Sequence, residues 1–377
     1  MHGIVQNDGH LHQNFMKMIS LAQDTQMHKN NTSALRTSAQ NSCLIDAKKK
    51  EGDLITDEFE CCTAANSSKR DRFSVVSLFS GAGGMDLGFI GGFDFLGKHY
   101  AQLPFDIIYA NELSPHACKT YRMNFEHPII EGDIYEHLDE LPDHADVVIG
   151  GFPCQDISIN GKMAGIQGKR SGLYSAIVEA VRRVKPKVLV VENVGSLLMK
   201  KHKSSLDKII ADFTSLGYQV SYQLYSAEQY AVPQTRERVF IVGVRHGVAP
   251  FCPPQPLASK PITAQEALYD LENKAEDKAF SHVWSKAKVS GEQGNRRLLA
   301  NRPGYTIRAE CHGNIQFHYS LSRRISMREA ARLQSFPDSF TFACGIRETE
   351  RQIGNAVPPV LAWYIARSVL NTLTASK

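Results

Sequence analysis

Residues 73–84 read Phe-Ser-Val-Val-Ser-Leu-Phe-Ser-Gly-Ala-Gly-Gly, and this stretch indicates the architecture of the chain. It begins with an apolar run, Val75–Phe79, whose length and composition are typical of a strand buried on both faces. Glycines at 81, 83 and 84 follow, and they allow the backbone to approach a ligand closely. Neither Gly-x-Gly-x-x-Gly nor Gly-Lys-Ser/Thr is present, so the stretch is neither the dinucleotide fingerprint nor a P-loop.

Three later apolar runs, Ile107–Ala110, Val147–Ile149 and Val188–Val191, each precede a loop and a helical pattern. Such alternation predicts β-α units and a buried parallel sheet. Two further strands are predicted at Gln219–Leu224 and Val239–Val244. We therefore expect an α/β fold: a Rossmann-like, mixed and mostly parallel sheet with helices on both faces, plus a smaller irregular domain.

Terminal signals predict three helices. Ser204–Leu216 has an apolar stripe at helical spacing, with Ser204 as the expected N-cap and Gly217 as the stop. Ser326-Met-Arg-Glu329 is a capping box, which opens a helix that runs through about Gln334. A final helix is expected from about Val360 to Leu373.

Composition divides the chain into four segments. Residues 1–72 are polar with little apolar periodicity, so a largely flexible extension is expected. Residues 73–246 carry the β-α units, and a proline cluster then breaks the pattern as a domain boundary would. We interpret 247–320 as a second, smaller domain, inserted into a first domain that 321–377 completes.

Basic residues gather in one part of the chain. The net charge is only +4, yet residues 281–332 hold ten Lys/Arg against three Glu, a local charge of +7. An electrostatic footprint for phosphate looks like this. A solvated charged face gives the same pattern, and charge alone does not separate the two.

Several classes of protein are excluded. No apolar run approaches the roughly 18 residues that span a bilayer, and the polar N-terminus lacks the apolar region of a secretion signal. The eight cysteines form no CxxC pair or regular spacing, so neither a zinc site nor a disulfide framework is predicted. Reduced thiols in a cytoplasmic protein are the expectation.

Polar residues follow several predicted strands where each one ends. Glu112, Asp133 and Glu192 are examples, and open α/β sheets bind ligands along that edge. Glu112 suits a pair of ribose hydroxyls and Asp133 an adenine amino group, so the set fits an adenosine ligand without a phosphate clamp. The alternative is a series of tight turns and solvent-facing caps.

Cys154, in Gly151-Phe-Pro-Cys-Gln155, differs from the other cysteines in its context. Pro153 stiffens the backbone before it, and a thiolate at this edge could act as a nucleophile if its pKa is lowered. No histidine lies nearby in the sequence, so a protease-like Cys–His pair is not indicated. Glu192 supplies a carboxylate, and Gln234-Thr-Arg-Glu-Arg238 supplies cations.

With these motifs in this order, residues 73–377 resemble the bacterial cytosine-C5 DNA methyltransferase family, of the restriction-modification type. The fold that this implies is the S-adenosylmethionine-dependent methyltransferase fold. The segments that carry the resemblance are 79–85, 111–113, 132–134, 151–156, 192–194, 234–239, 328–334 and 352–358. Residues 1–72 lie outside it.

The resemblance implies a mechanism. Cys154 adds to C6 of a flipped-out cytosine, Glu192 holds or protonates N3, and Arg238 contacts the base. The methyl donor is S-adenosylmethionine, S-adenosylhomocysteine is the product, and no metal has a role. The implied catalytic set is Pro153, Cys154, Glu192, Arg236 and Arg238, with Arg236 and Ser158 near the flipped nucleotide.

The resemblance also implies binding residues. The 247–320 segment becomes a target-recognition domain, and 155–171 a loop that closes over the DNA backbone. The implied donor-site residues are Phe79, Gly81, Ala82, Gly83, Gly84, Met85, Glu112, Leu113, Asp133, Ile134, Leu173, Asn355 and Val357. The implied DNA contacts are Ser158, Lys162, Lys169, Arg170, Gln234, Arg296, Arg297 and Arg308.

The expected partner is double-stranded DNA with a short, palindromic site, and a companion restriction endonuclease would act on the same site. A monomer is expected. An insertion-like stretch, Gly91–Asp106, is expected on the surface. An RNA (tRNA) cytosine methyltransferase, a DNA-binding regulator acting through residues 1–72, and an NAD-type oxidoreductase are the alternatives. The absence of a Cys-Phe-Thr motif argues against the RNA methyltransferase. The absence of a helix-turn-helix pattern argues against the regulator, and the absence of Gly-x-Gly-x-x-Gly argues against the oxidoreductase.

Overall fold

The computed structural model describes residues 72–152, 172–288, 296–310 and 315–375. All of them lie within one compact unit, Ser68–Lys377. Pro153, Cys154, Ser158, Lys162, Lys169 and Arg170 fall outside the described residues, as do residues 1–71.

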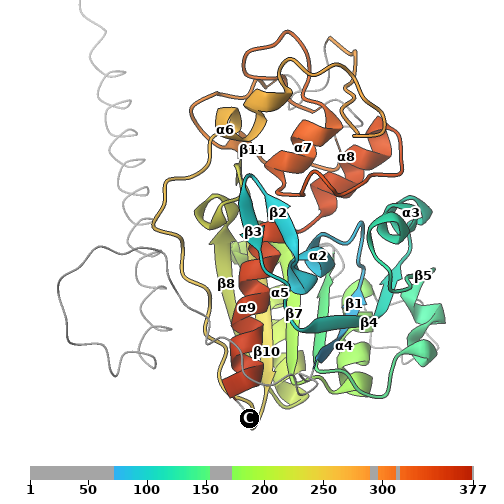
Figure 1. The fold of residues 1–377 in the computed structure, drawn as a ribbon. Helices are drawn as coiled ribbons and strands as arrows, with labels where there is room; N and C mark the ends of the chain where they lie inside the picture. Colours follow the sequence, from blue (N-terminus) through green and yellow to red (C-terminus); the bar gives the residue numbers. More distant parts are fainter. Residues whose placement is uncertain (1–71, 153–171, 289–295, 311–314, 376–377) are drawn as a thin grey trace, which may run out of the picture. The chain divides into compact units, whose positions relative to one another are not determined.

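A seven-stranded sheet forms the centre of this unit, in the order β5-β4-β1-β6-β7-β10-β8 (Figure 1). The pairs among its first five strands are parallel, whereas β10 is antiparallel to both β7 and β8. This confirms the predicted mixed, mostly parallel sheet. The strands are β1 (Phe73–Leu78), β4 (Phe105–Glu112), β5 (Ile130–Glu131), β6 (Val147–Gly151), β7 (Val188–Val194), β8 (Tyr218–Ser226) and β10 (Glu237–Arg245).

Alternate residues of the sheet supply two separate cores, as strand geometry requires. Val75 and Val190 belong to one cluster, with α2 (Gly84–Ile90) and α9 (Pro359–Ala375). Val76 and Val191 belong to the other, with α4 (Leu173–Val184) and α5 (Lys203–Ser215). Helices therefore cover both faces of the sheet. A further helix, α3 (Pro115–Asn124), follows β4 and is capped by Ser114.

A third cluster holds α6 (Ala264–Leu268), α7 (Met327–Leu333) and α8 (Ile346–Asn355) together. These helices and the irregular chain between them lie beyond one end of the sheet in Figure 1. We call the described part of residues 262–356, which contains these three helices, the upper lobe. The predicted capping box is present, since Glu329 N donates to Ser326 Oγ at 3.0 Å and Ser326 N donates to Glu329 Oε2 at 2.7 Å.

Two local predictions were wrong. The helix α5 begins at Lys203 with His202 at its N-cap, so Ser204 lies inside the first turn. A 3₁₀ turn, Lys200–His202, leads directly into this helix and replaces the extended cap residue. Gly217, with φ +90°, does follow the end of the helix.

The stretch Gly91–Asp106 is not simply on the surface. It forms a hairpin of β2 (Phe93–Phe95) and β3 (Lys98–Tyr100) with buried aromatic side chains. Tyr100 stacks on Phe93 and meets the edge of Trp363 at 5.2 Å between ring centroids. The alternation of apolar and polar residues gives this hairpin one apolar face, and α9 covers it.

Two short strands, β9 (Gln234–Thr235) and β11 (Gly304–Tyr305), pair with each other in parallel. Within the described ranges no helix combines the length and the apolar content needed to cross a membrane. The same ranges hold no group of three or more His, Cys, Asp or Glu side chains arranged to bind a metal ion.

Candidate active site

Glu192 and Arg238 form an ion pair at the edge where the parallel strands end. Glu192 lies near the end of β7 and Arg238 near the start of β10, and the antiparallel register brings these two ends together. Arg238 Nε is 2.7 Å from Glu192 Oε1, with side-chain exposures of 13% and 12%. A charge-assisted bond so shielded from water fixes the orientation of the carboxylate.

The chain leaves β6 beside this pair. Gly151 is in register with Glu192, and a Cβ on Gly151 would lie 3.0 Å from Glu192 Oε2. Asn193 Nδ2 donates to Phe152 O at 2.9 Å, which ties the last described residue of this segment to β7. The sequence places Pro153 and Cys154 immediately after Phe152.

The glycine loop between β1 and α2 is built on left-handed backbone, with φ of +59° at Gly81 and +90° at Gly83. Glu112 holds this loop, because Gly81 N donates to its Oε2 at 2.9 Å. Its Oε1 accepts from Ser114 N at 2.8 Å. A Cβ on Gly81 would meet nothing within 4 Å, so open space lies over the loop. On Gly84 it would lie 2.5 Å from Val357 O.

Neighbouring strand ends are tied by backbone and amide contacts. Asn111 Nδ2 donates to Ile130 O at 3.2 Å and to Gly132 O at 3.1 Å, which fixes the turn that carries Asp133. Asp133 caps a 3₁₀ turn by accepting from Tyr135 N at 3.1 Å. Leu113 is 61% exposed beside Glu112.

The other expected donor-site residues come from several elements. Phe79 takes a left-handed φ of +57°, and Val357 packs against Gly84. Asn355 ends α8 and is exposed. Leu173 begins α4, while Ala82, Met85 and Ile134 are buried.

This edge fits an adenosine-type ligand. Open space lies beside Gly81, and the Glu112 carboxylate retains lone pairs for ribose hydroxyls. The exposed side chain of Leu113 offers an apolar surface to a purine ring. None of the strand ends places a cation cluster there for a phosphate, among the residues that the structure describes.

Arg236 does not occupy the place that the sequence resemblance implied. It is 0% exposed, and its guanidinium donates to Ile307 O, Gly354 O and Ala356 O. Burial lowers the pKa of Arg236 well below its usual value. With both terminal nitrogens bonded to backbone, this side chain is not available to a base.

Gln234 also differs from the expectation of a DNA contact. Gln234 is 0% exposed, and its amide is bonded within the protein. Arg297 is exposed, and its Nη1 donates to His318 O at 2.6 Å and to Leu321 O at 2.8 Å. Arg296 lies over the Tyr305 ring, and Arg296 and Arg308 are exposed.

Sequence reasoning missed the asparagines that hold the site. Asn111 precedes Glu112 and Asn193 follows Glu192, and each amide bonds to the backbone of a neighbouring segment. An amide beside a carboxylate at a strand end was the available signal. The sequence also carried no indication that Gln334 donates to the carbonyl of Ala356, because the two residues are distant from each other in the chain.

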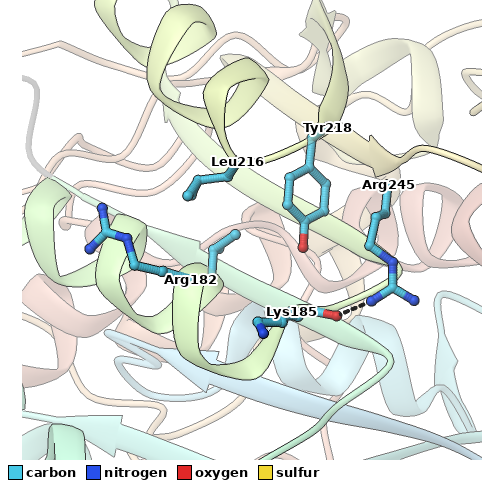
Figure 2. Close-up of a pocket in the computed structure, with 6 residues that line it drawn as sticks. Arg182, Lys185, Leu216, Tyr218 and Arg245 are labelled. Atoms are coloured by element: carbon cyan, nitrogen blue, oxygen red, sulfur yellow. Dashed lines mark hydrogen bonds between the residues drawn. The ribbon is translucent and has the colours of Figure 1, made fainter.

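A separate hollow lies at the opposite edge of the sheet (Figure 2). Tyr218 begins β8, Arg245 ends β10, and Lys185 follows α4. Arg245 Nη1 donates to Lys185 O at 2.6 Å across it, which is the dashed line in Figure 2. None of the expected site residues that the structure describes lines this hollow.

Sequence comparisons agree with this geometry. The family model of C-5 cytosine-specific DNA methylase matches residues 73–296 and 259–371. Type II methyltransferase M.NgoFVII of Neisseria gonorrhoeae is 36% identical over 341 residues, covering 81% of this chain and 88% of its own. Type II methyltransferase M.FnuDI of Fusobacterium nucleatum is 32% identical over 338 residues, covering 80% and 95%.

Solved structures share the fold. A chain described as a DNA modification methyltransferase encoded within a prophage of E. coli aligns with a TM-score of 0.60 at 23% identity, over 80% of this chain and 99% of that one. DNMT2 of Spodoptera frugiperda aligns with a TM-score of 0.59 at 15% identity, over 80% and 99%. At such identities the likeness concerns the fold alone.

Proposed function

The chain belongs to the C-5 cytosine-specific DNA methylase family, and from that premise we propose how its residues share the work. The enzyme is a DNA (cytosine-5-)-methyltransferase, and it methylates C5 of a cytosine in DNA. We propose further that the target is a short, specific sequence in double-stranded DNA. We also propose the residue roles below, and that the enzyme protects this sequence from a companion restriction endonuclease. The Glu192–Arg238 ion pair at the ligand-binding edge carries the proposal.

Cys154 is the proposed nucleophile. Cytosine C5 is a poor nucleophile, and addition of the Cys154 thiolate to C6 moves electron density towards C5. Loss of the C5 proton and expulsion of the thiolate restore the aromatic ring after transfer. Because C5 and C6 are stacked inside a duplex, the base must first be flipped out.

Glu192 and Arg238 act on the ring while charge develops. Glu192 holds or donates a proton at N3, and Arg238 contacts the base and keeps the carboxylate in place. The short Nε to Oε1 distance supports this division, since a preoriented pair needs no reorganisation during the reaction. Both groups lie at the edge where β6 delivers the residues before Cys154.

S-adenosylmethionine supplies the methyl group as an electrophile when it is bound. The residues that would hold it are the glycine loop 79–85, Glu112, Leu113, Asp133, Ile134, Leu173, Asn355 and Val357. Glu112 would accept from the ribose hydroxyls and Asp133 from the adenine amino group. The open space over Gly81 and the exposed side chain of Leu113 support this fit.

The DNA-binding residues are proposed from exposure and from the sequence. Arg296 and Arg308 remain candidates because their side chains are exposed on the basic segment. Ser158, Lys162, Lys169 and Arg170 stay candidates from the sequence. We infer a target-recognition role for 247–320, which shares the third hydrophobic cluster with α7 and α8. A monomer, a cytoplasmic location where bacterial DNA lies, and a companion endonuclease complete the proposal.

One experiment tests this function. DNA from a host that expresses the protein is analysed by bisulfite sequencing, with a host expressing Cys154→Ala as the control. We expect one short sequence to carry 5-methylcytosine only with the unaltered protein. No methylated motif, or the same motif with Cys154→Ala, would overturn the proposal.

A further inference from the structure

A buried polar network joins four segments that are far apart in the sequence. Its side chains are Gln234, Arg236 and Gln334, each 0% exposed, and we call them the polar clasp. Gln234 Nε2 donates to Gln334 Oε1 at 2.6 Å and to Leu333 O at 3.0 Å. Its Oε1 accepts from Ile307 N at 3.0 Å. Gln334 Nε2 donates to Ala356 O at 2.6 Å.

Arg236 closes the clasp by bonding to two segments at once. Its Nη1 donates to Ile307 O at 3.1 Å, and its Nη2 donates to Gly354 O at 2.8 Å and Ala356 O at 3.0 Å. Ile307 lies in the basic segment, one residue before the exposed Arg308. Residues 354–356 lead into Val357, whose carbonyl packs on Gly84 of the donor loop.

The two segments that Arg236 joins, 304–309 and 354–356, have little room to move relative to each other. A Cβ on Gly354 would lie 2.5 Å from Ala309 N, so the backbones of 308–309 and α8 are in direct contact. Thr306 Oγ1 donates to Thr235 O at 2.5 Å, which fastens the same segment to β9. Segment 304–309 is therefore held against β9 on one side and against the end of α8, which precedes Val357, on the other.

Arg236 is also close to the reacting edge. It lies two residues before Arg238 on the chain, and the charges of Arg238 and Glu192 both act on it, the first lowering and the second raising its pKa. Loss of its bonds would take a donor from the carbonyls of Ile307 and Gly354 and so lower stability, whereas Ala356 O would keep Gln334 Nε2 as a donor. A merely structural arginine would show that loss of stability and nothing else.

We propose that Arg236 is a positioning residue that couples recognition of the DNA sequence to binding of the methyl donor. The inference rests on the proposed function. DNA seated against Arg308 fixes segment 304–309, and through Arg236 it fixes residues 354–356 beside Asn355 and Val357. Such coupling is reciprocal, so cognate DNA tightens donor binding by the factor by which the donor tightens DNA binding.

The test measures that factor directly. The affinity for S-adenosylhomocysteine is determined by calorimetry with and without a duplex that carries the methylated motif. We expect the duplex to tighten binding at least fivefold in the unaltered protein, the lower end of about 5–150-fold for coupled sites. In Arg236→Lys we expect less than about twofold, because one ammonium cannot reach both Ile307 O and the 354–356 carbonyls.

Arg328→Lys is the matched control. Arg328 is 1% exposed and also donates to three carbonyls, those of Phe280, Pro337 and Phe340. All three lie outside segments 304–309 and 354–356. Arg328→Lys should lower the melting temperature as Arg236→Lys does, yet keep the coupling factor of the unaltered protein.

Two results overturn the proposal: a coupling factor near one in the unaltered protein, or an unchanged factor in Arg236→Lys. If Arg236→Lys does not fold, Arg236→Gln decides, since its shorter side chain cannot bond to Ile307 O and to the 354–356 carbonyls at once. An unchanged factor in Arg236→Gln then overturns the proposal. Failure of the proposed function itself is distinct, because the unaltered protein would then methylate no DNA.

Discussion

Arg238 Nε lies 2.7 Å from Glu192 Oε1, although the two residues come from strands that run in opposite directions. The pair exists because β10 reverses direction and starts where β7 ends. A carboxylate held in this way is ready to act on a base without rearrangement.

Glu192→Gln should leave donor and DNA binding nearly intact and lower kcat by about 10²–10⁴-fold, the usual range for loss of a positioned acid or base. Glutamine keeps an oxygen that can accept from Arg238, but it is uncharged and cannot donate or accept a proton as a carboxyl group does. Single-turnover methyl transfer, with donor affinity measured in parallel, checks this. A rise in KM at unchanged kcat would contradict the assigned role.

Cys154→Ala should abolish methyl transfer while the affinity for S-adenosylhomocysteine stays within about twofold, because the thiol is assigned to the base and not to the donor. With the unaltered protein, donor and DNA that carries 5-fluorocytosine at the target, a covalent complex should survive denaturing electrophoresis, since fluorine cannot leave as the proton does. Absence of that complex from an enzyme that methylates normal DNA would refute the covalent step.

Gly81→Ala and Gly88→Ala should separate ligand binding from stability. A Cβ on Gly81 meets no neighbour but enters the space over the donor loop, so donor affinity should fall at least tenfold with about 1–2 kcal/mol of backbone strain. On Gly88 it would lie 2.4 Å from Ala362 Cβ and 2.6 Å from Pro359 O, so stability should fall by about 1–3 kcal/mol. Thermal unfolding and donor titration distinguish them, and equal losses of affinity would contradict the assignment.

Asp86→Asn should change the pH dependence of stability. Burial raises the pKa of Asp86 from 3.8 to about 6, so the folded protein holds this proton more tightly than the unfolded chain. The contribution of Asp86 is therefore most favourable below about pH 4 and is lost as the pH rises through 6. Asparagine keeps an acceptor for Tyr121 Oη, which donates to Asp86 Oδ1 at 2.8 Å, and it carries no charge to bury.

Urea unfolding at several pH values measures this difference. Asp86→Asn should be more stable than the unaltered protein at pH 8, by an amount on the order of 2–3 kcal/mol. The advantage should shrink towards zero near pH 4. An advantage that is constant with pH would show that ionisation of Asp86 is not its cause.

Arg308→Gln and Arg297→Gln should behave differently although both arginines are in the basic segment. Arg308 is exposed, so its loss should weaken DNA binding and reduce the salt dependence by about one charge. Arg297 is exposed too, but its guanidinium is bonded to two backbone carbonyls, so its loss should lower the melting temperature instead. Fluorescence anisotropy at several salt concentrations checks the pair, and identical salt slopes for the two variants would contradict it.

Much of the sheet, the glycine loop after its first strand and one helix start could be predicted because the signals are local. The run at 75–79, the glycines after it and the capping box at 326–329 each act within a few residues. Arg236 and Gln234 could not be placed in this way. Their burial depends on Ile307 and Gly354, which no spacing in the sequence associates with them. The hairpin at 93–100 is similar, because its partner Trp363 lies near the end of the chain.

The packing of α9 against α2 has a consequence for biosynthesis. Gly88 lies against Pro359, Ala362 and Trp363, and Val360, Leu361 and Ile365 fill the same core as Val75 and Phe89. These residues are translated after the glycine loop and after every strand of the seven-stranded sheet. The nascent chain therefore carries its glycine loop long before it carries the helix that supports it. A premature stop codon ahead of residue 359 would remove this helix, so we expect an inactive product whatever else the message encodes.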